Sequence, residues 1–231
     1  MIMKDNVKGL TKHNVDQHGV DLVINDSVTS IYLALGLIQR QYPDSSFSAL
    51  LLLANGLERI LKCVLILEDG YTVHKEFFTG QQGHKIKVLM EKVLDYISRF
   101  DGFGDHIITP FYNNIKDNVD LFDKLEDFSI TGRYLGLDFA CGREGWKVHG
   151  KACEETNWEE YYEKCKKFIE NDYLIECTER FLSLIGRFLR FKYSRFPGIW
   201  DFGKLVLDHE IGRTDYGTFL HGEGVTWPWR R

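Results

Sequence analysis

The stretch of sequence that decides the fold runs from Ser46 to Leu67 and reads SFSALLLLANGLERILKCVLIL. Its apolar residues recur at helical spacing and nearly encircle the axis, which predicts a helix packed between other helices. Ser45 and Ser46 are favourable N-cap residues, and Asp69-Gly70 predicts the end of the helix. We therefore expect an all-α protein organised around this one apolar helix.

Further amphipathic helices are expected on both sides of this stretch. Asn25, Asp26 and Ser27 are good N-cap residues for a helix that ends near Pro43, and residues 20–24 before them read as a short extended segment. The glycine-containing stretch 70–83 reads as a loop. Helical spacing of apolar residues then predicts helices over about 84–100, 111–128, 157–171 and 173–193.

These elements predict a single helical domain in three parts. Residues 1–25 form an N-terminal extension, and residues 26–195 form an up-and-down bundle of four to six helices. Five glycines after residue 131 indicate a loop or short helix within residues 129–150. The aromatic, irregular C-terminal segment, residues 196–231, is too apolar to be disordered, so we expect it to pack onto the bundle or onto a partner subunit.

Composition excludes several classes of protein. The net charge of −5 over 231 residues argues against non-specific nucleic-acid binding through overall charge. The five cysteines form no C-x-x-C pair, and His149 with Cys153 supplies only two ligands, so we expect reduced thiols, no metal and no cofactor. No secretory signal is evident, and the longest apolar run, Ala49–Ala54, is far below the ~20 residues of a membrane span. We therefore expect a cytoplasmic protein with no membrane partner.

Common catalytic motifs are missing from the sequence. It contains no phosphate-binding G-x-x-x-x-G-K-[ST] loop and no dinucleotide-binding G-x-G-x-x-G after a strand. It also lacks the G-x-S-x-G elbow of esterases and the H-E-x-x-H helix of zinc proteases.

A polar stripe crosses the apolar helix at Asn55, Glu58 and Lys62, which share one face. A carboxylate and an ammonium four residues apart can pair, which lowers the cost of burying them. One interpretation is a solvated stripe, and the other is a stripe that faces a cleft between helices. His84, at the start of the next predicted helix, is either a solvent-facing cap or a partner of Glu58 or Lys62.

Three segments of the chain resemble the HEPN superfamily (higher eukaryotes and prokaryotes nucleotide-binding). They are SALLLLANGLERILKCVLIL at 48–67, GHKIKVLMEKVL at 83–94 and TGRYLGL at 131–137. Members often carry an apolar helix with a Glu and a Lys four apart, a Gly-His start to the next helix, and a late Arg-Tyr pair. The resemblance implies a helical bundle, frequently a homodimer, whose members include RNases of toxin–antitoxin and other defence systems as well as inactive binding modules. Arg133 and Tyr134 of the third segment are either a structural anchor, with Arg133 binding a carboxylate such as Glu58, or ligand-binding residues of the cleft.

Catalytic members of that superfamily carry an Arg, four to six residues, and then a His. The His acts as general base or acid on the ribose 2′-hydroxyl, and the Arg stabilises charge on the phosphate. Arg99 to His106 and Arg143 to His149 both match this spacing. The second pair fits better, because polar Glu144 follows the Arg, so Arg143 and His149 are the candidate catalytic residues.

Basic residues gather at the end of the last predicted helix, including Arg187, Arg190 and Arg195. They either complement the helix macrodipole or contact a phosphate backbone. Three hypotheses follow: a nucleotide- or RNA-binding or regulatory module, a metal-independent RNase that uses Arg143 and His149, and a helical small-molecule-binding protein whose pocket the aromatic tail lines.

Overall fold

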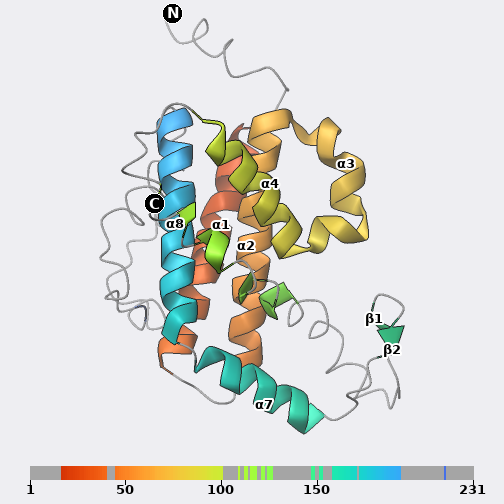
Figure 1. Ribbon diagram of the computed structural model, residues 1–231, viewed down its shortest axis with the longest axis vertical. Helices are drawn as coiled ribbons and strands as arrows, with labels where there is room; N and C mark the ends of the chain where they lie inside the picture. The colour runs from red at the N-terminus through yellow and green to blue at the C-terminus, as the bar shows by residue number, and fades with distance from the viewer. Residues whose placement is uncertain are drawn as a thin grey trace, which may run out of the picture.

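The computed structural model describes two long stretches of the chain, several short ones and single positions, namely residues 17–40, 45–100, 109, 112–113, 115–118, 121–122, 124–126, 147–148, 151–152, 158–170, 172–193 and 216. Their elements are helices, except for one antiparallel pair of two-residue strands, β1 (Lys147–Val148) and β2 (Lys151–Ala152). The prediction of an all-α protein is therefore confirmed (Figure 1).

Helices α1 (Gln17–Gln39) and α2 (Ser46–Asp69) pack against each other as an antiparallel pair. Gly56 marks their closest approach, because a Cβ added there would lie 2.6 Å from Cγ1 of Ile31 and 2.8 Å from the carbonyl oxygen of Ser27. Only glycine leaves room for a backbone this close. The glycine in the middle of α2 is thus explained by helix packing.

Helix α2 occupies the centre of the described helices, as the sequence predicts. It contacts α1, α4 (Ile86–Ser98) and α7 (Trp158–Ile169), while α8 (Asp172–Lys192) runs beside them (Figure 1). Most of its apolar residues are buried, namely Ala49, Leu50, Leu53, Ala54, Leu57, Ile60, Leu61, Cys63, Val64 and Leu65. Such burial on several sides at once is what an almost fully apolar helix requires.

Helix α1 begins earlier than the sequence suggests. The expected extended segment at residues 20–24 is wrong, and so is the expected helix start at Asn25 to Ser27, because the helix runs through both. The hydroxyl of Ser27 donates to the carbonyl oxygen of Val23 at 2.5 Å, so the residue is satisfied inside the helix. The Ser27 hydroxyl, which could cap a helix, therefore bonds to the backbone of the same helix. Val20, Ile24 and Val28 belong to the buried face of α1 on both sides of this position.

The expected loop at residues 70–83 is also wrong, because it holds two helices. Gly70 ends α2 with a φ of 84°, a conformation that favours glycine, and α3 (Tyr71–Thr79) and the short 3-10 helix η3 (Gln81–His84) follow. His74 and Phe78, four residues apart, are both buried and hold α3 in place. In Figure 1, α3 lies to one side of α2 and α4.

The later helices occur where the sequence places them. Helices α4, α7 and α8 match the predictions closely, and the described positions between 112 and 126 are helical or in turns. Most of 129–150 and nearly all of the C-terminal segment lie outside the described residues. Tyr216 of that segment is buried: its backbone N–H donates to Gln39 Oε1 and its hydroxyl to Glu179 Oε1, both at 2.7 Å. This residue packs onto the helices, as we expect for the tail.

One helix in the described part of the chain, over Gly19–Gln39, is long and apolar enough to cross a membrane, with a mean hydropathy of 1.4. Half of that stretch is buried inside the protein. Length and hydropathy alone do not separate a spanning helix from the core helix of a soluble protein, and α1 packs closely against α2.

Candidate functional site

The polar stripe of α2 meets η3 at one carboxylate, and we call Glu58, Lys62 and His84 the carboxylate site. The Lys62 ammonium lies 2.8 Å from Oε1 of Glu58, and Nδ1 of His84 lies 3.0 Å from the same oxygen. The Glu58 side chain is only 9% exposed, whereas that of His84 is 46% exposed. The buried carboxylate of Glu58 thus contacts the half-buried ammonium of Lys62 and the accessible imidazole of His84.

Local sequence explains how the three side chains come together. Glu58 and Lys62 are one helical turn apart on α2, so their pairing follows from helix geometry. His84 reaches them because η3 folds back against α3. A Cβ at Gly83 would lie 2.2 Å from the carbonyl oxygen of Phe77, so this approach requires the glycine beside His84.

The contact with Glu58 fixes the chemistry of the His84 ring. An ionised carboxylate only accepts hydrogen bonds, so Nδ1 must carry the proton that faces Glu58. Nε2 is then the free lone pair of a neutral ring or the second donor of a protonated one. This nitrogen makes no hydrogen bond to any described residue and is the atom of the site that can bind or exchange a proton with a ligand.

Of the other candidate site residues from the sequence, Asn55 is among the described residues and four are not. Asn55 lies one turn before Glu58 on α2 and is half-buried. Arg133 and Tyr134 lie outside the described residues, as do the candidate catalytic residues Arg143 and His149. Their roles therefore stay predictions.

The basic end of α8 is only partly open to solvent. Arg187 and Arg190 are half-buried, and burial lowers the pKa of Arg187, while Arg195 lies outside the described residues. Lys192, on the same turn, lies 2.5 Å from Oε2 of Glu68. At least one cation of this end is therefore used in holding two helices together.

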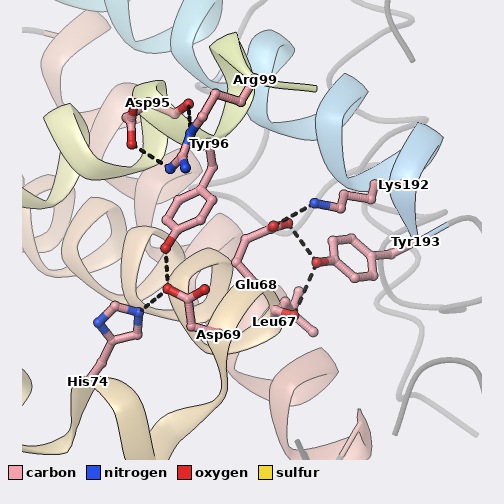
Figure 2. Close-up of polar contacts among 9 residues, drawn as sticks. All are labelled: Leu67, Glu68, Asp69, His74, Asp95, Tyr96, Arg99, Lys192 and Tyr193. Carbon is pink, nitrogen blue, oxygen red and sulfur yellow. Dashed lines mark hydrogen bonds and ion pairs between the residues drawn. The ribbon is translucent and has the colours of Figure 1, made fainter. Parts of the chain in front are cut away.

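A second group of polar residues gathers where α2 ends, and we call it the anchor cluster: Glu68, Asp69, His74, Tyr96, Lys192 and Tyr193 (Figure 2). The carboxylate of Asp69 contacts Nε2 of His74 at 2.8 Å and accepts a hydrogen bond from the Tyr96 hydroxyl. Glu68 accepts from the Tyr193 hydroxyl at 2.6 Å. The two adjacent acids thus connect α2 to α3, α4 and the end of α8.

Two tyrosines of the anchor cluster are strongly affected by this setting. Burial, the hydrogen bond to Asp69 and its negative charge raise the pKa of Tyr96 to about 12. Burial and the neighbouring Glu68 raise the pKa of Tyr193 further. Both groups stay neutral donors at physiological pH, which suits a structural role.

The anchor cluster is absent from the sequence predictions, which treat Asp69 only as the end of a helix. One signal was available: two adjacent acids stand at a helix C-terminus, where the macrodipole disfavours negative charge. Such a placement requires compensating partners. The sequence does not identify these partners, because Lys192, for example, lies 124 positions from Glu68.

Metal and thiol chemistry find little support among the described residues. None of their His, Cys, Asp and Glu side chains form a group of three that could hold a metal ion. Cys63, Cys165 and Cys177 are buried free thiols. Burial raises the pKa of Cys63 to about 12 and that of Cys177 to about 11, so neither is a reactive thiolate at neutral pH.

Comparison with known proteins yields no family model, no curated protein and no solved structure that matches this chain.

Proposed function

We propose that this protein is a HEPN-like nucleotide- or RNA-binding or regulatory module, and that the carboxylate site binds a phosphate group of its ligand. The observation that supports this most directly is that Lys62 and His84 share one oxygen of the buried Glu58. Two nitrogen bases are thereby held in place by a single acid. The resemblance of segments 48–67 and 83–94 to the HEPN superfamily supports the same site.

The charge balance of the site favours an anion when His84 is protonated. Lys62 and protonated His84 together carry two positive charges against the single negative charge of Glu58. Charge-assisted hydrogen bonds from an imidazolium and an ammonium are the common means of binding phosphate.

Equilibrium titration of the full chain with AMP and with a short single-stranded RNA tests this proposal. His84→Asn keeps an N–H donor toward Glu58 and removes Nε2, so it should weaken binding at least about tenfold. Arg99→Ala is the matched control, because Arg99 forms an exposed ion pair with Asp95 away from the site. No binding of either ligand to the unaltered protein would overturn the proposal.

The RNase alternative makes a separate prediction. Cleavage of single-stranded RNA in the presence of EDTA, lost in both Arg143→Ala and His149→Ala, would establish metal-independent catalysis. Binding without cleavage over a wide range of protein concentration would leave the binding or regulatory module. Sedimentation of the same samples tests the homodimer that the HEPN resemblance implies. The same resemblance places the module in a prokaryotic defence or toxin–antitoxin system.

The small-molecule alternative concerns the aromatic tail. Deleting residues 197–231 should abolish ligand binding and leave the helical signal intact if the tail lines a pocket. Tyr216 instead packs against Tyr32, with ring centroids 5.4 Å apart, and bonds to Glu179. These contacts favour a structural tail, whose removal lowers stability as well.

A further inference from the structure

The carboxylate site continues into a row of aromatic rings and lysines, and we propose that Phe77 in this row stacks an unpaired nucleobase while Lys62 and His84 hold the attached phosphate. This inference rests on the proposed function and deepens it, because it names the part of the ligand bound beside the phosphate. The row runs across α2, α3 and α4.

The row is continuous from the carboxylate site to α4. The Lys62 ammonium, which pairs with Glu58, also lies 5.7 Å from the centroid of the Phe78 ring. The Phe78 and Phe77 centroids are 5.8 Å apart, and the Lys92 ammonium lies 5.0 Å from the centroid of Phe77. A cation therefore lies at each end of two neighbouring rings.

Burial identifies which of the two rings a ligand can reach. Phe78 is 8% exposed, with the His74 ring packed 5.4 Å from it, so it belongs to the core. Phe77 is half-buried, and Lys92, an exposed side chain, lies over its ring. A flexible ammonium at an exposed site contributes only about 0.5–1 kcal/mol to such a contact, so a flat base can take its place.

After a base displaces it from the Phe77 ring, Lys92 can still contact the bound ligand. Its ammonium stands on a flexible, exposed side chain and can pair with a phosphate or with the edge of the base. Aromatic rings that stack bases, interleaved with cations that follow the phosphates, are the usual design of single-strand binding surfaces. Phe77 supplies the first element, and Lys62, His84 and Lys92 supply the second.

Local charge also favours a phosphate-bearing ligand on this surface. Segment 71–92 contains four lysines (Lys75, Lys85, Lys87 and Lys92) and two glutamates (Glu76 and Glu91), a net charge of +2, whereas the whole chain carries −5. A locally basic surface on an acidic protein attracts anions. Paired bases cannot stack on a side chain, so the ligand is a free nucleotide or single-stranded RNA and not a duplex.

Titrations of the full chain with AMP and with ribose 5-phosphate separate the base from the phosphate. Phe77→Leu should weaken AMP binding roughly tenfold, because the stacked ring is lost, and should leave ribose 5-phosphate binding unchanged. Phe77→Tyr keeps an aromatic ring and should retain AMP affinity. Thermal unfolding of each variant verifies the fold, and the Phe77→Tyr result keeps the test valid if Phe77→Leu is unstable.

A second pair of variants tests the lysine. Lys92→Ala should weaken binding of a short single-stranded RNA, whereas Arg99→Ala should not, although Arg99 lies over the Tyr96 ring of the same helix at a similar 4.9 Å. Equal dependence of AMP and RNA on Phe77 identifies the free nucleotide as a sufficient ligand. A dependence seen only with RNA identifies the strand as the source of the base.

The outcomes distinguish this inference from the function on which it rests. If His84→Asn weakens AMP and ribose 5-phosphate binding equally and Phe77→Leu weakens the binding of neither AMP nor the single-stranded RNA, the stacking site is wrong and the phosphate site stands. If the unaltered protein binds none of the three ligands, both proposals are overturned.

Discussion

His84 and Glu58 stand 26 positions apart in the sequence, and Nδ1 of the imidazole lies 3.0 Å from Oε1 of the carboxylate. This contact joins the central helix α2 to η3, a short element at the end of the segment that the sequence predicts to be a loop. Since Lys62 reaches the same oxygen, the contact makes a polar stripe on a core helix into a site with an accessible nitrogen.

The buried acid of the carboxylate site should contribute to stability. Glu58→Gln removes the charge that balances Lys62 in a setting where the Glu58 side chain is 9% exposed, so we expect a loss of about 1–3 kcal/mol in the free energy of unfolding. Asp95→Asn breaks the ion pair with Arg99, whose side chains are 62% and 61% exposed, and should cost less than about 1 kcal/mol. Urea unfolding of both variants compares them, and equal losses would contradict the burial argument.

Gly56 is expected to tolerate no side chain. Gly56→Ala places a methyl group 2.6 Å from Ile31, and the forced separation of α1 from α2 should destabilise the protein by about 1–3 kcal/mol despite the better helix propensity of alanine. Ser48→Ala, at an exposed position of the same helix, should change stability by less than about 0.5 kcal/mol. Chemical denaturation measures both, and a stabilised Gly56→Ala protein would mean that the helices are farther apart.

The anchor cluster predicts a loss of stability at alkaline pH. The pKa of Tyr96 is raised to about 12 in the folded protein, above the ordinary value of about 10. A raised folded-state pKa gives a contribution that is present below the unfolded pKa and is lost as the pH rises through the folded value, hence between about pH 10 and 12. Tyr96→Phe should therefore flatten the decline in unfolding free energy over this window.

Tyr71 provides the control for that measurement, since it lies on α3 and is 48% exposed. Tyr71→Phe should leave the slope of stability against pH as it is in the unaltered protein. An unchanged slope in Tyr96→Phe as well would show that Asp69 does not hold the Tyr96 hydroxyl.

The C-terminal segment should contribute to stability through Tyr216. Tyr216→Phe removes the hydroxyl that donates to Glu179, an acid only 5% exposed, and should cost about 1–3 kcal/mol. Tyr173→Phe removes a hydroxyl that accepts from Asn118 at an exposed position and should cost less. If both substitutions have the same small effect in urea unfolding, Tyr216 is not anchored as described.

Local patterns predicted much of this architecture. The length of α2, its termination at Asp69-Gly70 and the pairing of Glu58 with Lys62 all follow from helical periodicity and cap chemistry. For His84 the sequence leaves two alternatives, a solvent-facing cap or a partner of Glu58 or Lys62, because its contact depends on how η3 folds back. A pairing between distant segments leaves no periodic signal in one sequence.

Two errors share a physical cause. Asn25 to Ser27 read as a helix cap because serine and aspartate favour caps, yet burial of the Val20, Ile24 and Val28 face outweighs that local preference. Helix α3 is missed because its nine residues are flanked by glycines and, among the side chains of this helix that the structure describes, His74 and Phe78 alone are buried. Tertiary packing determines the structure of both segments, and local helix propensity does not reveal that packing.

The central claim is that the carboxylate site binds phosphate through Lys62 and the Nε2 atom of His84. Its most direct test is the dissociation constant of AMP for the unaltered protein, for His84→Asn and for Arg99→Ala, measured by calorimetric titration. We predict at least a tenfold weaker affinity for His84→Asn and an unchanged affinity for Arg99→Ala. Equal affinity in all three proteins, or no binding to any of them, would contradict the claim.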